Sequence, residues 1–93
     1  MNRPWFVYLL ECANERLYVG ITPDLAKRFA THAAGKGGTF TRLNCPLRML
    51  AATACDSRSS AARLEISMKS LTPWQKRYMA RTWELRDDLP TVP

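Results

Sequence analysis

Five side chains along the sequence are of types that take part in hydrolytic chemistry. Arg28 carries a planar guanidinium that suits phosphate oxygens and the charge that develops at a transition state. His32 is the only histidine, and an ordinary histidine pKa of ~6.5 suits proton transfer. Tyr8 and Tyr18 carry hydroxyls that can orient or deprotonate water, although a phenol of pKa ~10 needs help to act as a base. Glu65 adds one carboxylate.

Each of these side chains also has an ordinary structural explanation. A single arginine on a helix flank is most often solvated, and tyrosines are common in strands. A histidine near the C-terminal end of a helix is favoured by the helix dipole. Glu65 precedes Lys69 by four residues, which predicts an ion pair of ~0.3–0.5 kcal/mol. On the residues alone that pair is the favoured explanation of Glu65, and the choice of base among Tyr8, Tyr18 and His32 stays open.

The two tyrosines fall on predicted strands that form a hairpin. Residues 5–10 and 16–21 are rich in aromatic and branched side chains, which is typical of strands. With a three-residue connection, Tyr8 pairs with Gly20, and side-chain alternation then places Tyr8 and Tyr18 on the same face of the sheet. A four-residue connection would place them on opposite faces.

The arginine and the histidine fall on a predicted helix. Thr22-Pro23-Asp24 is typical of a helix start, with a hydroxyl cap, a proline and an acid in the first turn. We expect the helix to run to about Ala34 and to stop at Gly35. Arg28 and His32 are four residues apart, so they share one flank of the apolar arc. That position predicts the rim of a site rather than the core.

A third strand and two further helices complete the predicted fold. The strand spans residues 47–55, and a helix follows from about 58 to 71 with Glu65 on the shoulder of its apolar stripe. A capping box at residues 72–75 predicts a final helix to about Trp83. The order β-β-α-β-α-α predicts an α+β fold with a small three-stranded antiparallel sheet flanked by helices. Residues 87–93 are expected to form a loose tail.

The chain has the size and composition of one domain. Residues 1–93 are 46% apolar, and we expect a single core over about 5–83 that includes Trp74 and Trp83. Three cysteines with loose spacings fit neither a disulfide framework nor a zinc site, which favours a reducing compartment. The longest apolar run, residues 5–10, is too short for a bilayer span of ~20 residues or for a signal peptide. These features predict a cytoplasmic protein.

The charge balance points to a polyanionic partner. The net charge is +6, from 14 basic and 8 acidic side chains, which favours nucleic acid first. On charge alone, a merely soluble basic protein is equally compatible. Lys27, Arg42 and Lys36, which lies in a flexible basic loop at residues 35–39, are candidates for contacts with phosphates. Such contacts position nucleic acid without reading its sequence.

The spacing of these residues resembles a known family. Val7-Tyr8-Leu9, eight further residues and Tyr18-Val19-Gly20 resemble the paired motif of the GIY-YIG nuclease superfamily. Arg28, His32 and Glu65 continue that pattern in order on the expected helices. A narrower resemblance to the small bacterial UPF0213 or YhbQ-like subfamily is carried by residues 17–22, His32 with 35–37, and Leu71-Thr72 with Gln75-Lys76.

The resemblance covers residues 5 to 83 and implies both fold and activity. It implies a GIY-YIG-like domain and a metal-dependent endonuclease that hydrolyses phosphodiester bonds in DNA, with structured or damaged DNA in repair as a candidate substrate. The implied cofactor is Mg²⁺ or Mn²⁺ on Glu65, and the implied catalytic residues are Tyr8, Tyr18, Arg28, His32 and Glu65. A domain this small leads us to expect weak intrinsic activity or a protein partner that supplies specificity.

Two departures from the family pattern favour a different function. The first triplet retains only Tyr8, and the final helix lacks the asparagine that larger relatives carry. The alternative is a non-catalytic nucleic-acid-binding module that keeps the fold and binds with strong salt dependence. A third hypothesis, a protein-interaction domain, leaves the set of Tyr8, Tyr18, Arg28, His32 and Glu65 unexplained.

Overall fold

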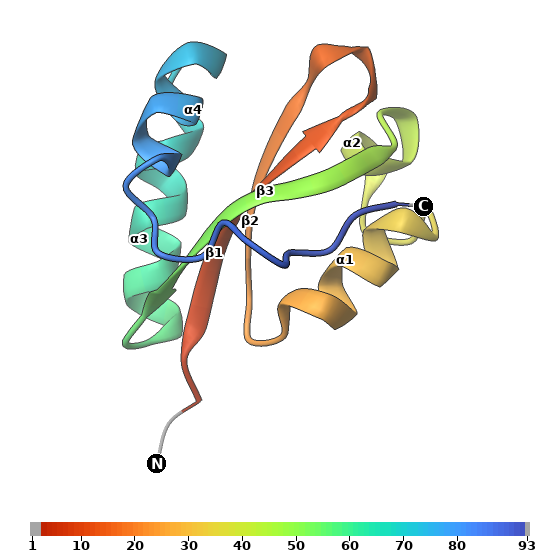
Figure 1. The fold of residues 1–93 in the computed structure, drawn as a ribbon. Coiled ribbons are helices and arrows are strands. Elements are labelled where there is room, and N and C mark those ends of the chain that lie inside the picture. Colours follow the sequence, from red (N-terminus) through yellow and green to blue (C-terminus); the bar gives the residue numbers. More distant parts are fainter. Residues whose placement is uncertain (1–2, 93) are drawn as a thin grey trace.

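The fold is a three-stranded antiparallel sheet with helices on both faces (Figure 1). The computed structural model describes residues 3–92. β1 (Trp5–Cys12) is the central strand, with β2 (Leu17–Thr22) on one side and β3 (Pro46–Cys55) on the other. The helices are α1 (Leu25–Ala33), α2 (Thr39–Leu43), α3 (Arg58–Lys69) and α4 (Pro73–Ala80). The predicted α+β class and the three-stranded sheet are confirmed, and α2 is an additional helix that the sequence did not predict.

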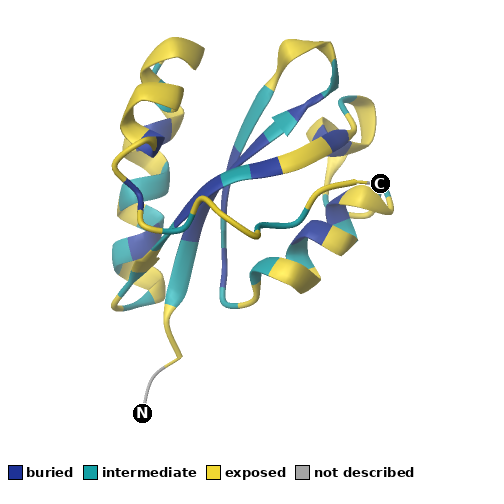
Figure 2. Ribbon diagram, viewed as in Figure 1, coloured by how far each residue is buried: buried dark blue, intermediate teal, exposed yellow. Residues whose placement is uncertain are grey.

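The central strand is buried on both faces because a layer of helices covers each (Figure 2). Val7 and Leu9 point to one core, where Ala61 and Met68 of α3 pack against them. Tyr8 and Leu10 point to the other core, with Phe29 of α1. A strand covered on both faces has no polar side to alternate with, which explains its continuous apolar sequence.

The turn between β1 and β2 has the length that the predicted register requires. Residues 13–15 form a single 3₁₀ turn, in which Asn14 and Glu15 have φ of 63° and 59°. Cys12 N–H donates to the carbonyl of Arg16 at 2.8 Å and closes the loop. Tyr8 therefore pairs with Gly20, as predicted for a three-residue connection.

The first helix begins later than predicted. Asp24 is the N-cap, and its carboxylate accepts a hydrogen bond from Lys27 N–H at 3.1 Å. The Thr22 hydroxyl accepts from Asp24 N–H at 3.1 Å, so it orders the turn before the helix, and the prediction of Thr22 as the cap was wrong. The stop at Gly35, with φ of 77°, is confirmed. Glycine is favoured there because other residues are strained in the left-handed region.

The two C-terminal helices follow the predicted capping but end earlier. Thr72 and Gln75 form the predicted capping box of α4, which ends at Ala80 and not at Trp83. Trp83 is buried as expected, whereas Trp74 is 70% exposed and stacks on Tyr78 at 5.3 Å, so its placement in the core was wrong. Within residues 3–92, no helix has both the length and the apolar character needed to cross a membrane.

The segment after α4 lies along the outer edge of β3 and is not a loose tail. Leu85 exchanges two backbone hydrogen bonds with Ala52, at 2.9 and 3.1 Å. Met49 N–H donates to the carbonyl of Pro90, and Val92 N–H donates to that of Leu47, both at 2.9 Å. The prediction of a loose tail is therefore wrong for residues 87–92, and Pro93 lies outside the described residues. We call residues 85–92 the C-terminal strap.

Truncation after Leu85 tests whether the strap stabilises the fold. The variant loses the hydrogen bonds to Pro90 and Val92 and the packing of Leu89 against the core. We expect the free energy of unfolding to fall by about 2–3 kcal/mol in a urea titration. Asp87→Ala, at an exposed position of the strap, is the control. Equal stability of truncated and full chains would contradict the assignment.

Candidate active site

The hairpin and α1 bring two tyrosines and the histidine together on one face of the sheet. The rings of Tyr8 and Tyr18 lie with centroids 6.4 Å apart. His32 presents its ring edge-on to both, at 5.9 Å from Tyr8 and 5.2 Å from Tyr18. The three residues come from β1, β2 and α1, so the cluster exists only when the sheet and the helix are both formed.

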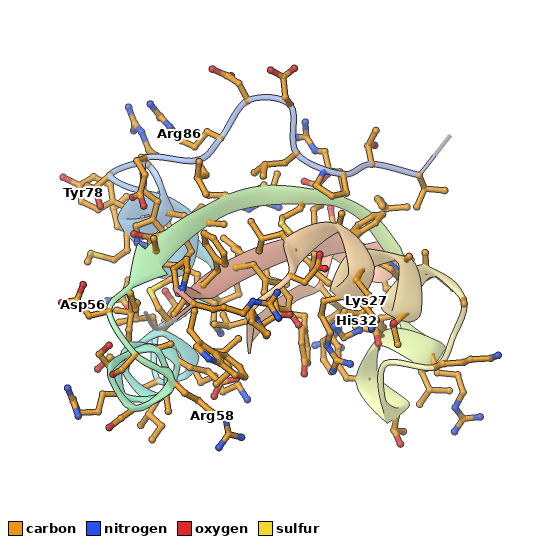
Figure 3. All side chains as sticks on the ribbon, turned by 90° about the horizontal axis from the view of Figure 1, so that it is seen from below. Lys27, His32, Asp56, Arg58, Tyr78 and Arg86 are labelled. Atoms are coloured by element: carbon orange, nitrogen blue, oxygen red, sulfur yellow. The ribbon has the colours of Figure 1, made fainter. Side chains whose placement is uncertain are left out.

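His32 is held by hydrogen bonds at both ring nitrogens. Its Nε2 shares a 2.8 Å hydrogen bond with the Tyr8 hydroxyl, and its Nδ1 shares another of 2.8 Å with the Thr41 hydroxyl. Either tautomer of the ring satisfies both bonds. His32 and Thr41 are 0% and 1% exposed. Figure 3 shows the His32 side chain surrounded by other side chains on the side of α1 that faces α2. The prediction that His32 lines a rim was wrong, because α2 closes over it.

Arg28 extends from α1 across this cluster. Its Nε donates to the Tyr8 hydroxyl at 3.4 Å, and its Nη2 donates to the carbonyl of Gly37 at 3.2 Å. The hydrogen bond to Tyr8 raises the pKa of Arg28, and Tyr18 contributes in the same direction. Among residues 3–92, Nε and Nη2 donate these two hydrogen bonds and Nη1 donates none, although Tyr18 is close enough to contribute to the raised pKa.

Burial sets the protonation states of the inner pair. Burial raises the pKa of Tyr8 to about 12, although the hydrogen bond from Arg28 opposes this shift. Burial also lowers the pKa of His32 to about 4, and the positive charge of Arg28 adds to that effect. At neutral pH the phenol and the imidazole are therefore both uncharged.

Two glycines leave the space that this pair occupies. A Cβ added at Gly20 would overlap the hydroxyl of Tyr8. Gly20 is the register partner of Tyr8, and the Tyr8 side chain passes over β2 at this position. A Cβ added at Gly37 would overlap the ring of His32. The glycine of the Tyr-Val-Gly triplet, Gly20, is thus required by close approach and not by a special backbone angle.

Glu65 reaches the site from α3, on the other side of the β2 edge. Its carboxylate forms the predicted ion pair with Lys69 at 3.4 Å, and Lys69 Nζ lies 5.9 Å from the centre of the Tyr18 ring. The negative charge of Glu65 is one of the contributions that raise the pKa of Tyr8. The Glu65 side chain is 20% exposed, so its carboxylate lies in partly open surroundings.

The donor set fits a metal that is shared with a substrate. Within residues 3–92, no three His, Cys, Asp or Glu side chains converge on one point. Mg²⁺ is commonly held by one or two carboxylates together with waters and substrate phosphates. Glu65 supplies one such carboxylate, and the ion pair with Lys69 is of the surface kind that contributes little.

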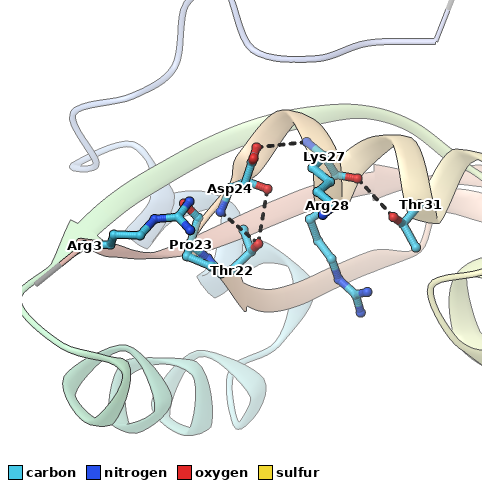
Figure 4. A pocket seen from close by; sticks show the side chains of 7 residues that line it. All are labelled: Arg3, Thr22, Pro23, Asp24, Lys27, Arg28 and Thr31. Carbon is cyan, nitrogen blue, oxygen red and sulfur yellow. Dashed lines mark hydrogen bonds between the residues drawn. The ribbon is translucent and has the colours of Figure 1, made fainter.

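The candidate phosphate-binding residues lie outside the buried cluster. Lys27 is exposed on α1 and lines a cavity together with Arg28 (Figure 4). Lys36 lies in the loop after α1, and Arg42 lies on α2; both are exposed. Lys27 is therefore joined to the cluster by a shared cavity, whereas Lys36 and Arg42 are placed only on the neighbouring surface.

Three residues of the site were missed from the sequence. Thr41 holds His32, Gly37 accepts from Arg28, and the ring of Phe40 lies 5.6 Å from that of Tyr18. All three belong to residues 37–41, where α2 begins. The sequence offers only an aromatic residue between two threonines after a pair of glycines, which does not distinguish a short helix from a loop.

Comparison with protein-family models identifies the class of domain that this fold and cluster represent. The model described as the GIY-YIG catalytic domain matches residues 4–78, which include every residue of the cluster. The chain belongs to the GIY-YIG family. At the level of the family, this supports an enzyme of the nuclease type, and nucleases of this family generally depend on a divalent metal.

Individual relatives narrow the comparison to UPF0213 proteins. A UPF0213 protein of Cupriavidus necator is 47% identical over 73 residues, 78% of this chain and 79% of its own. One of Vibrio cholerae is 39% identical over 90 residues, 96% of this chain and 89% of its own. The solution NMR structure of a UPF0213 protein of Bacillus halodurans matches with a TM-score of 0.53 and 36% identity, covering 84% and 83% of the two chains.

Gly20→Ala tests the close approach of β2 to Tyr8. The added methyl must displace the Tyr8 side chain, and we expect a loss of about 1–3 kcal/mol in the free energy of unfolding. Tyr8→Phe removes the nearest atom, so Gly20→Ala combined with Tyr8→Phe is expected to cost less than the sum of the two single changes. Strict additivity in a double-mutant cycle would argue against this contact.

The lowered pKa of His32 predicts a pH dependence of stability. The unfolded chain binds a proton at His32 below pH ~6.5, while the folded chain does so only near pH 4. The stability of the native protein should therefore fall with decreasing pH across this window, and His32→Gln should flatten the slope by up to about 1.4 kcal/mol per pH unit. Titration of the His32 ring by NMR near pH 6.5 in the folded chain would contradict this.

Proposed function

We propose that the protein is a metal-dependent endonuclease that hydrolyses phosphodiester bonds in DNA. One observation carries most of the proposal: Arg28 is anchored by Tyr8 and Gly37, and its Nη1 donates no hydrogen bond among residues 3–92. An anchored guanidinium with one unused edge suits the charge that develops on a phosphate. The family match supports the same class of reaction.

The burial of the three candidate bases distinguishes their roles. His32 and Tyr8 are buried and uncharged at neutral pH, so we assign them to the positioning of Arg28. Tyr18 is partly exposed beside Arg28 and Lys69, and we assign its hydroxyl to the orientation of the attacking water. Water attacks phosphorus in line, the bond to the leaving oxygen breaks, and Arg28 stabilises the charge on the non-bridging oxygens.

The metal in this proposal is Mg²⁺ or Mn²⁺ on Glu65. When bound, it supplies Lewis-acid stabilisation of the phosphate and of the leaving oxygen. Glu65 would hold the metal through a carboxylate oxygen in place of its ion pair with Lys69, and the freed Lys69 ammonium would be available to a phosphate. Lys27, Lys36 and Arg42 contribute contacts to flanking phosphates, and such contacts read no sequence.

The proposed substrate is structured or damaged DNA, which places the enzyme in repair. The net charge of +6 supports a polyanionic substrate. A partner protein that supplies specificity is part of the proposal, because none of the helices described in residues 3–92 resembles a base-reading helix. We propose that the enzyme works in the cytoplasm.

Cleavage assays with two site variants test the proposed function. Plasmid and branched DNA are incubated with Mg²⁺ or Mn²⁺ and with identically purified wild type, Glu65→Gln or Arg28→Lys. We expect no cleavage by Glu65→Gln and a kcat about 100- to 1000-fold lower for Arg28→Lys, because lysine cannot hold both anchors and a phosphate. Arg63→Lys, on the exposed surface of α3, should cut normally. Equal cutting by all four proteins would contradict the proposal.

The second candidate is a nucleic-acid-binding module without catalysis. Glu65 is paired with Lys69, and among residues 3–92 no three His, Cys, Asp or Glu side chains could hold a metal ion together; both observations favour this alternative. It predicts salt-dependent binding of DNA without cleavage under any metal. The same assay therefore separates the two functions.

A further inference from the structure

Two cavities lie at the two ends of β2, the edge strand beside the site. The first, of about 270 Å³, is lined by Thr22, the last residue of β2, and by Arg3, Lys27 and Arg28 (Figure 4). The second, of about 430 Å³, is lined by Leu17, the first residue of β2. Five steps along a strand separate the two ends, roughly 17 Å at ~3.3 Å per residue.

Each cavity is linked to the candidate active site through one of its lining residues. Arg28 lines the first cavity and also donates to the Tyr8 hydroxyl. Phe40 lines the second cavity, and its ring lies 5.6 Å from that of Tyr18. Among residues 3–92, β2 pairs with β1 and with no other strand, so its outer edge between the two cavities has no strand partner.

The linings of the cavities differ in chemistry. The first combines Arg3, Lys27 and Arg28 with one carboxylate, Asp24, which already caps α1. Three cationic side chains around a single carboxylate, which is already engaged as the N-cap, suit the binding of a phosphate.

The second cavity is larger and more mixed. It sets the cations Arg16 and Lys76 beside Glu15, together with the apolar side chains of Phe40, Leu17 and Pro73. The Phe40 side chain is 38% exposed, which is unusual for a ring that also packs in a site. Cations next to an exposed ring suit a nucleotide, with its phosphate on the cations and its base or sugar on the ring.

We infer that the bound DNA strand lies along the open edge of β2. One of its phosphates binds in the first cavity, and a nucleotide on the other side of the reacting phosphate binds in the second cavity. The inference takes its substrate class from the proposed function and adds Arg3, Arg16, Phe40 and Lys76 as contacts. A length of roughly 17 Å corresponds to about five nucleotides at 3.4 Å each along a B-form axis. The reacting phosphate then lies between the two cavities, over Tyr18 and Arg28.

Binding assays without cleavage test this placement. All variants carry Glu65→Gln, and a fluorescein-labelled DNA duplex with a single-stranded extension is titrated by anisotropy at several salt concentrations. Arg16→Ala with Lys76→Ala should raise Kd at least tenfold and lower the salt slope by about two. Phe40→Ala should raise Kd several-fold with an unchanged slope, because it removes contact area and no charge.

A matched double variant controls for net charge. Arg81→Ala with Arg86→Ala removes two positive charges as well, from the C-cap of α4 and from the strap, and Figure 3 shows Arg86 far from Lys27 and His32. We expect this control to change Kd less than threefold. Equal losses in both double variants, or an unchanged Kd for the β2 variants, would overturn the inference.

The outcome is separate from that of the proposed function. A wild-type protein that binds DNA through these residues but never cuts it would overturn the nuclease and support the β2 placement. If the Arg16 and Lys76 double variant cuts DNA normally at substrate concentrations below KM, the result would support the nuclease and overturn the placement along β2.

Discussion

The buried hydrogen bond between Tyr8 and His32 is the interaction on which the rest of the site depends. It joins the central strand to α1, and it lies between two glycines that leave room for the phenol and the imidazole. Both partners are uncharged, so the pair avoids the cost of a buried charge while it satisfies its polar atoms. Without this bond, Arg28 would lose the hydroxyl that anchors its Nε.

Charge is arranged in layers around that neutral pair. Arg28 lies at the boundary, where it helps to keep His32 unprotonated and where it can meet an anion. Glu65 and Lys69 lie across the β2 edge and partly cancel one another. The site therefore has a fixed, buried polar pair and, around it, charged side chains that can exchange partners. Such an arrangement suits a site that binds its cofactor and its substrate together.

Sequence reasoning succeeded where one short segment decides the outcome. The three-residue turn alone sets the register of β1 and β2 and therefore the common face of Tyr8 and Tyr18. The capping box of α4 is equally local. Reasoning failed where distant segments decide. Whether His32 is buried depends on α2, which covers it through Thr41, and hydrophobic periodicity cannot reveal a polar pair inside a core. The prediction that Trp74 is buried failed for a related reason. The size of its side chain indicates burial, but it lies on an exposed side of α4.

The C-terminal strap also limits how copies of the chain can associate. It covers β3 at Leu47, Met49 and Ala52, so that side of the sheet offers little backbone to another molecule. Sheets with two uncovered sides can add strands without end and grow into fibres. Among the described strands, β2 is the one whose outer edge can accept another strand, and two copies paired through β2 would use that edge in both. Strand addition would therefore stop at a closed, two-fold symmetric pair.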